Sequence, residues 1–304
     1  MTCLACKSKN LEFLLKAKDF EYFSTDQEFS YFKCKDCEAI SIDPPPINEL
    51  NIIYPKTYYS FDEQKEDVVQ KIKRYLESLM FKKLIREIPY NKDIKILDIG
   101  GGTGWMLKNI SLAIKELVQG TIVDIDVKAK KTAHKNGYDF INSTVEEFDS
   151  VKKYNLILML NLIEHISDPL KVLNKLSDYL EPGGKILIKT PNIDSLDFYI
   201  FNKTYWGGLH CPRHWILFND VSFKKLINST NLSLTSLRYT QGAPFWTWSL
   251  LNLLAQKKLI NFNKNNPIVH SNLAPVFNAI FAAFDFIRLP FSKTSQMFII
   301  LEKK

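Results

Sequence analysis

Four cysteines near the N-terminus have a spacing that is typical of a metal site. Cys3, Cys6, Cys34 and Cys37 form two C-x-x-C pairs. Such pairs present four thiolates to one ion, and four protein ligands leave no position open for chemistry. Two disulfides and four free thiols are the alternatives, and disulfides conflict with a cytoplasmic location. The spacing therefore predicts a structural Zn²⁺ ion, while the fifth cysteine, Cys211, is most simply a small packed residue.

A glycine-rich loop follows an apolar run in IKILDIGGGTG. Gly100, Gly102 and Gly104 let the chain turn tightly and let a ligand approach the next helix. A dinucleotide fingerprint starting at Gly100 needs a glycine at the position of Trp105, and the sequence contains no phosphate-binding P-loop motif. Asp124 ends the next apolar run, where a carboxylate can bind both hydroxyls of a ribose. The pattern therefore predicts a nucleoside ligand without a pyrophosphate.

A second acidic residue, Asp98, lies inside the strand that precedes the glycines. Its carboxylate could steer a cationic amino group through the loop backbone or through water. Capping of the following helix is the alternative role.

Three histidines are expected to meet at the carboxyl edge of a sheet, where open α/β folds bind ligands. His165 follows the apolar run YNLILMLN, and His210 and His214 belong to a later loop. A histidine there can take a proton from a hydroxyl near neutral pH, so His165 and His214 are the candidate catalytic bases. His165 could instead help to cap the next helix. The candidate substrate-binding residues are His210, Arg213 and His214. Arg213 is suited to a phosphate or carboxylate of the substrate.

The elements that must position these residues alternate between apolar strands and helical segments from residue 94 onward. Continuous apolar strands separated by helices indicate a mostly parallel sheet that is covered on both faces. The expected fold is α/β, a Rossmann-like doubly wound sheet, with a small N-terminal zinc ribbon and a helical insertion before the last strand. The expected divisions are a zinc module at 1–42, a proline-rich extended linker at 43–60 and a catalytic domain at 61–304.

The aromatic segment 240–293 is the expected insertion. Its apolar stretches could form a lid over the site, a dimer contact, or an in-plane helix at a membrane surface through residues 243–291. Polar residues interrupt the second stretch, which argues against a bilayer-spanning helix.

Composition favours a cytoplasmic globular protein. The N-terminus lacks the apolar core of a secretory signal, and no long uncharged apolar run occurs. The net charge of +7 arises from 40 basic and 33 acidic residues. Because these are spread along the chain, they indicate a solvated surface rather than a nucleic-acid footprint.

Three of these segments resemble the motifs of class I methyltransferases, which use S-adenosylmethionine (SAM). ILDIGGGTG is similar to the first motif, VDIDVKAKKTA to the second, and YNLILMLNLIEHISDPLKVLNKLSDYLEPGGKILIKTPN to the region of the fourth and fifth strands. The resemblance covers residues 94–192. It implies that the glycines hold the methionine part of SAM, Asp124 the ribose, Thr144 and Val145 the adenine, and that Asn161 lies near the sulfonium.

The resemblance continues into WGGLHCPRHWILF, which is similar to a segment of a subgroup associated with glycan and natural-product gene clusters. Many members of that subgroup also carry an N-terminal cysteine-rich module. This implies a small-molecule acceptor, above all a sugar or glycan intermediate, with O-methylation favoured over C- or N-methylation.

Alternative acceptors are a lipid-linked or quinone-like molecule at the inner membrane surface, and RNA or protein with the zinc module as reader. A nucleic-acid acceptor is disfavoured because no N-P-P-Y tetrapeptide follows the fourth strand. A protein that binds SAM without activity is disfavoured because the glycine loop and Asp124 are intact.

Overall fold

The computed structural model describes residues 1–55, 58, 68–201 and 204–304, with side chains from residue 75 onward in the helix that begins at residue 68. A seven-stranded sheet forms its centre, in the order β10-β11-β8-β7-β4-β5-β6. β11 runs antiparallel to both β10 and β8, and the other neighbouring pairs of this sheet are parallel. The strands are β4 (Ile94–Ile99), β5 (Val118–Asp124), β6 (Asp139–Asn142), β7 (Tyr154–Leu160), β8 (Leu180–Pro191), β10 (Leu232–Thr240) and β11 (Gln296–Lys303).

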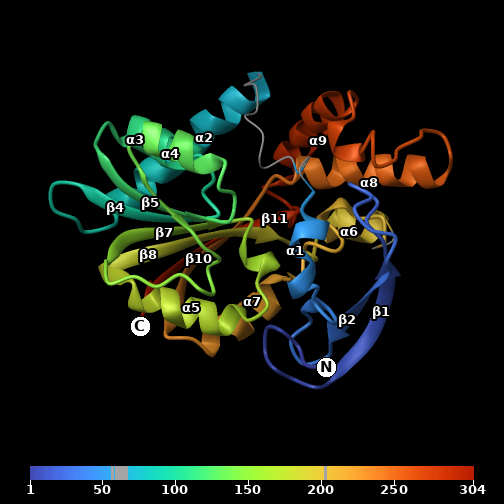
Figure 1. Cartoon of the computed structure of the whole chain (residues 1–304), viewed down its shortest axis with the longest axis horizontal. Helices are drawn as coiled ribbons and strands as arrows, with labels where there is room; N and C mark the ends of the chain where they lie inside the picture. The colour runs from blue at the N-terminus through green and yellow to red at the C-terminus, as the bar shows by residue number, and fades with distance from the viewer. Residues whose placement is uncertain (56–57, 59–67, 202–203) are drawn as a thin grey trace.

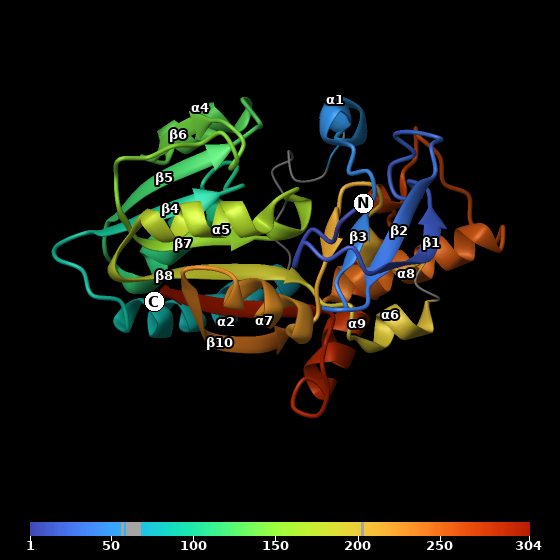
Figure 2. The ribbon, with the colours of Figure 1, turned by 90° about the horizontal axis from the view of Figure 1, so that it is seen from below.

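Helices cover both faces of this sheet, as the alternation of apolar runs predicted (Figures 1 and 2). α2 (Val68–Arg86), α3 (Trp105–Ile114) and α4 (Ala129–Lys135) pack on one face, and α5 (Pro169–Asp178) and α7 (Asp220–Asn228) pack on the other. The central strands β4 and β7 are buried almost throughout because each of their faces meets a helical layer. The Rossmann-like doubly wound fold is therefore confirmed.

The N-terminal ribbon forms a second, four-stranded sheet in the order β1-β2-β3-β9. Its first three strands are β1 (Leu11–Ala17), β2 (Phe29–Cys34) and β3 (Ile40–Ile42). The fourth, β9 (Ile216–Leu217), comes from the second half of the chain and pairs antiparallel with β3. The ribbon therefore shares a sheet with the domain that follows it in sequence.

The segment 43–60 corrects one expectation. Instead of an extended linker, part of it folds into a 3₁₀ turn, η1 (Ile47–Glu49), and a short helix, α1 (Leu50–Ile53). The three prolines end just before these turns, where a fixed φ suits a helix start. Residues 56–57 and 59–60 of the predicted linker lie outside the described residues.

The predicted insertion is helical and consists mainly of α8 (Ala243–Gln256) and α9 (Ala274–Arg288). Asp285 joins the two helices, because its carboxylate accepts hydrogen bonds from Gly242 N (2.9 Å) and Trp246 Nε1 (3.2 Å). The ring of Trp246 stacks on Phe281 at 5.4 Å. Shorter elements at this end of the molecule are α6 (Leu196–Ile200), η4 (Gly207–Leu209) and η5 (Ile268–His270). Within the described residues, none of the helices has the length and apolar character needed to cross a membrane.

Candidate functional site

The glycine loop turns sharply between β4 and α3. Gly100, Gly102 and Gly104 have φ angles of 75°, 51° and 79°, which L side chains rarely adopt. A Cβ atom at Gly104 would lie 2.6 Å from the ring of Tyr138. The close approach of the loop to that ring therefore also requires a glycine at position 104. Gly102 N donates a hydrogen bond to Asp124 Oδ2 at 2.8 Å. The loop and the carboxylate at the end of β5 therefore lie side by side, as the sequence predicted.

Asp98 is buried at the end of β4, and its Oδ2 atom has no hydrogen-bond partner among the described residues. Burial, with a further contribution from the charge of Asp124, raises the pKa of Asp98 to about 7. A Cβ atom at Gly101 would lie 2.5 Å from Asp98 Cγ, so the backbone closes directly over this carboxyl group. A cation bound at the loop would offset the negative charge of Asp98 and Asp124.

The other predicted cofactor residues lie at the ends of neighbouring strands. Thr144 is half-buried after β6, where its Oγ1 accepts a hydrogen bond from Glu147 N at 3.3 Å, and Val145 is buried beside it. Asn161 follows β7 with a φ of 54°, and its Oδ1 accepts a hydrogen bond from Gln296 Nε2 at 3.1 Å. All of these residues belong to the same edge of the sheet as the glycine loop.

The three histidines form one cluster. The ring of His214 lies 4.8 Å from the rings of both His165 and His210, measured between centroids. His165 ends η3 (Ile163–His165), the turn that follows β7, while His210 and His214 come from the loop before β9. Trp215 N donates a hydrogen bond to Glu164 O at 2.7 Å and so joins that loop to η3. The predicted convergence of the histidines is present in the structure.

The two candidate bases are held in the neutral form. Burial, followed by the neighbouring charge of His210, lowers the pKa of His165 to about 3. Burial, followed by His165, places the pKa of His214 well below its usual value. A general base works best when its pKa lies near the operating pH. These rings alone are therefore too weakly basic to remove the proton of a sugar hydroxyl efficiently.

Helix capping, the alternative role of His165, belongs to another residue. Asp168 caps α5 by accepting a hydrogen bond from Lys171 N, and Pro169 occupies the first helical position. His165 Nδ1 instead lies 3.0 Å from Arg213 O and 2.8 Å from Tyr54 Oη.

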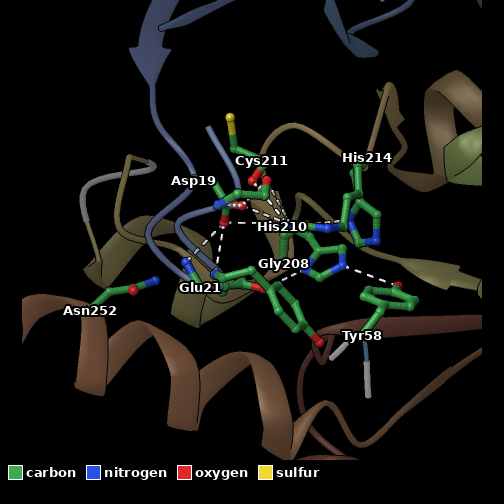
Figure 3. A network of polar contacts seen from close by, with 12 residues as sticks. Asp19, Glu21, Tyr58, Gly208, His210, Cys211, His214 and Asn252 are labelled. Carbon is green, nitrogen blue, oxygen red and sulfur yellow. Dashed lines mark hydrogen bonds and ion pairs between the residues drawn. The ribbon is translucent and has the colours of Figure 1, made fainter. Parts of the chain in front are cut away.

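The N-terminal ribbon contributes two acids that the sequence analysis did not include. Arg213 is fully buried and donates to Asp19 at 2.7 Å (Nη2–Oδ2) and 3.3 Å (Nη1–Oδ1). His210 Nδ1 hydrogen-bonds to Glu21, and its Nε2 lies 3.3 Å from Tyr58 Oη. Figure 3 shows both acids reaching the 208–214 loop from the N-terminal segment. The charge of Arg213, expected to meet a phosphate or carboxylate of the acceptor, is thus compensated within the protein.

The only sequence signal for these partners was the pair of acids in the aromatic stretch KDFEYF. Charged residues between apolar ones indicate either a solvated face or a buried ion pair. The partners lie 194 and 189 positions away, so spacing could not identify them.

The four N-terminal cysteines converge as predicted. Cys3 Sγ and Cys37 Sγ are 3.6 Å apart, as are Cys6 Sγ and Cys34 Sγ, and all four sulfurs lie within 4.8 Å of one another. A tetrahedral zinc ion with bonds of about 2.3 Å requires sulfur atoms about 3.8 Å apart. The arrangement therefore fits a four-cysteine zinc ion.

Comparisons with known proteins agree with the fold and the glycine loop. The family described as "Methyltransferase domain" matches residues 72–237, which is more than half of the chain. The ubiquinone biosynthesis O-methyltransferase of Dictyostelium discoideum mitochondria is 23% identical over 169 residues, which cover 48% of this chain and 51% of that protein. The enzyme of the same name from Rickettsia conorii is 28% identical over 117 residues, covering 37% and 39%. The chain thus spans about half the length of these relatives, or less.

A solved structure of coclaurine N-methyltransferase, bound to N-methylheliamine and SAH, superposes with a TM-score of 0.51. Its sequence identity is 13%, with 84% of this chain and 80% of that chain covered, so this likeness concerns the fold. The family match over residues 72–237 supports an assignment to a family, beyond the likeness in fold. The chain belongs to the methyltransferase-domain family and has the class I fold.

Proposed function

We propose that this methyltransferase transfers the methyl group of SAM to an oxygen atom of a small molecule, and that sugar or glycan intermediates are the first acceptors to test. One observation carries the proposal: the cofactor loop and the histidine cluster are adjacent. Leu162, the residue before η3, has a methyl group 3.4 Å from the Cβ position of Gly100. An acceptor held at the cluster would therefore lie beside a cofactor held at the loop.

The cofactor roles follow from the geometry of the loop. Gly100, Gly102 and Gly104 would hold the methionine part, while Asp124 would bind the ribose hydroxyls. Asp98 and Asp124 supply negative potential for the ammonium and sulfonium charges, which fits the unpartnered Oδ2 of Asp98. Thr144 and Val145 would lie beside the adenine, and Asn161 near the sulfonium.

Methyl transfer from a sulfonium is an in-line displacement, so the protein must above all hold the acceptor oxygen close to the methyl carbon and exclude water. The histidine cluster is suited to this because tyrosines surround it: Tyr54 lies against His165, and Tyr22 and Tyr58 against His210. Arg213, stacked on Tyr22 at 4.4 Å and paired with Asp19, fixes the loop that carries His210 and His214. We assign Arg213 a positioning role on this basis.

Labelled methyl transfer tests the proposal directly. Purified protein and SAM with a labelled methyl group are incubated with nucleotide sugars, glycan-lipid extracts, phenolic quinone precursors and RNA, and products are identified by mass spectrometry. Label on an oxygen of a sugar or glycan is the expected result, and it should be lost in Asp124→Asn. Label on carbon, nitrogen or RNA alone would refute the oxygen assignment.

An acceptor linked to a lipid is the second candidate, because α9 carries an exposed apolar stripe at helical spacing. With Leu273 just before the helix and Phe291 after it, its members are between 40% and 88% exposed: Leu273, Val276, Ile280, Phe284, Ile287 and Phe291. Residues 241–293 contain five basic side chains and a single acid, Asp285, which is buried and paired with Arg288. Apolar side chains flanked by basic ones match an anionic lipid surface. The name of the ubiquinone-pathway relatives points the same way.

We further propose that Cys3, Cys6, Cys34 and Cys37 hold a structural Zn²⁺. The short sulfur–sulfur distances support this, and the ion would stiffen the ribbon that carries Asp19 and Glu21. Elemental analysis of protein produced with adequate zinc tests it, with one zinc ion per chain expected.

A further inference from the structure

A second group of metal-ligand residues lies inside the histidine cluster. Within the described residues, Glu164, His165 and His214 each offer a ligand atom, and these atoms lie within 4.8 Å of one another. His214 Nε2 and Glu164 Oε1 are separated by 3.9 Å, too far for a hydrogen bond but close enough for both to bind one ion. Adjacent ligands of one octahedral ion with bonds of about 2.1 Å are about 3 Å apart, so ion binding requires Glu164 Oε1 and His214 Nε2 to approach each other by about 1 Å.

The hydrogen bonds of the two histidines prepare them as ligands. His165 Nδ1 faces Arg213 O at 3.0 Å, and His214 Nδ1 faces Gly208 O at 2.8 Å. A carbonyl oxygen can only accept, so in His214 the proton lies on Nδ1 and the lone pair on Nε2. His165 Nδ1 also lies 2.8 Å from Tyr54 Oη, and the same tautomer fits both of its contacts when that hydroxyl accepts. Metal-binding histidines usually have this arrangement, in which a backbone carbonyl fixes the tautomer and the ring orientation.

Glu164 is fully buried, and only one of its two carboxylate oxygens has a hydrogen-bond partner among the described residues. Its Oε2 accepts a hydrogen bond from Thr190 Oγ1 at 2.9 Å, whereas its Oε1 has no hydrogen-bond partner in the part of the chain that the structure describes. A buried carboxylate without a partner is costly unless a proton or a cation neutralises it. The guanidinium of Arg213, which belongs to the same loop as His214, is committed to Asp19. An ion between Glu164 and the two rings would satisfy Oε1.

The third histidine has a different role. His210 Nδ1 is held by Glu21, and its Nε2 faces Tyr58 Oη. Both ring nitrogens of His210 are thus engaged by other side chains. The ligand set is therefore two histidines and one carboxylate, a combination that suits Mn²⁺, Fe²⁺, Co²⁺ or Zn²⁺ and leaves coordination positions open.

We propose that Glu164, His165 and His214 bind one divalent transition-metal ion beside the cofactor loop, and that its open positions receive the acceptor oxygen. This role rests on the proposed O-methyl transfer. A bound cation lowers the pKa of a coordinated hydroxyl, whose proton leaves to solvent. The oxygen then forms a bond to the methyl carbon while the carbon–sulfur bond breaks, and its electron pair stays on the sulfur of the neutral thioether product. No electron is exchanged with the metal.

The test measures Mn²⁺ binding to the full-length, zinc-loaded protein without SAM or acceptor, by electron paramagnetic resonance of free Mn²⁺. Mn²⁺ is chosen because it prefers nitrogen and oxygen ligands to the thiolates of the ribbon. One Mn²⁺ per chain is expected, with at least tenfold weaker binding in Glu164→Gln and in His214→Gln. His134→Gln, a substitution on the exposed side of α4, is the matched control and should bind like the wild type.

Two results would overturn the inference: no Mn²⁺ binding to the wild type, or equal affinity in the double variant Glu164→Gln, His214→Gln. If the variants fail to fold by circular dichroism, pulsed resonance of the wild-type complex decides, because histidine ligation requires nitrogen couplings on the bound Mn²⁺ and their absence refutes the site. Mn²⁺ binding without methyl transfer would count against the proposed function alone. Methyl transfer without Mn²⁺ binding would count against the metal site alone.

Discussion

Arg213 and Asp19 form a fully buried ion pair that joins the 208–214 loop to the N-terminal ribbon, with Nη2 and Oδ2 2.7 Å apart. The same loop carries His210 and His214, so the position of the histidine cluster depends on a residue that precedes the whole central domain. The burial of both partners makes the pair costly to break on one side only.

Asp19→Asn should lower the free energy of unfolding by about 3–5 kcal/mol, because it leaves a buried guanidinium without its counter-charge. Urea denaturation followed by circular dichroism measures this loss. Lys152→Gln is the matched control, since its ion pair with Asp139 is exposed and should contribute at most about 1 kcal/mol. A loss below about 1 kcal/mol in Asp19→Asn would contradict the structural role of the pair.

Asp124→Ala should weaken SAM binding by about 1–3 kcal/mol, because the ribose hydroxyls would lose their acceptor in a partly buried site. Isothermal titration calorimetry gives the affinity. Asp139→Ala, an exposed acid at the start of β6, should leave it unchanged. Wild-type protein that binds NAD and not SAM would refute the assignment of the loop.

SAM affinity should fall as the pH drops below about 7, by up to about tenfold per pH unit. In the free protein Asp98 has a pKa of about 7, raised by burial and by Asp124. A bound cation favours the ionised form, so binding below that pH must release a proton, whereas above it the carboxylate is already charged. Calorimetry between pH 5.5 and 8.5 measures the slope. The Asp98→Asn variant should bind SAM more weakly, and its affinity should depend less on pH. An unchanged slope in this variant would show that Asp98 does not cause the pH dependence.

Removal of zinc should unfold the ribbon and destabilise the central domain with it. The ribbon shares the β3–β9 pairing and the Asp19–Arg213 pair with that domain. Cys6→Ser and Cys34→Ser together should therefore abolish zinc binding and lower the melting temperature by several degrees. Cys211→Ser, which alters a cysteine outside the cluster, should retain one zinc per chain. Full zinc content in the double variant would contradict the ligand set.

Replacing two residues of the α9 stripe should reduce binding to anionic vesicles. Ile280→Glu with Phe284→Glu places two charges where the apolar side chains would enter the lipid, and at least tenfold weaker partitioning is expected in sedimentation assays. Leu117→Glu is the control, because Leu117 is 75% exposed but lies at the start of β5, away from α9. If the wild-type protein does not bind anionic vesicles, or if it dimerises through α9, the membrane interpretation is wrong.

The sequence predicted the central fold because the apolar runs around β4, β5, β7 and β8 are continuous and each is followed by a helical pattern. It also predicted that the cysteines pair as knuckles and that the histidines share one edge of the sheet. The turns at 47–53 were missed because three prolines argue for extended chain, although a proline also favours the start of a helical turn.

The partners of the 208–214 loop could not be predicted from the sequence. Periodicity reports which face of an element is buried, but it carries no information about contacts between distant segments. Asp19 and Glu21 lie in the loop between β1 and β2, where no spacing constrains the direction of their side chains. The buried charge of Arg213 is therefore known only from the three-dimensional contact.

The pairing of β3 with β9 has a consequence for the order in which the chain is completed during synthesis. The ribbon emerges from the ribosome before the central domain, yet the edge of β3 has no partner until residues 216–217 follow, after β4 to β8 have been made. An unpaired strand edge invites pairing with other chains. Early capture of a metal by the cysteines would hold the nascent ribbon compact through that interval, and the loop with the histidines would then be set in place as the last strand of the ribbon sheet closes.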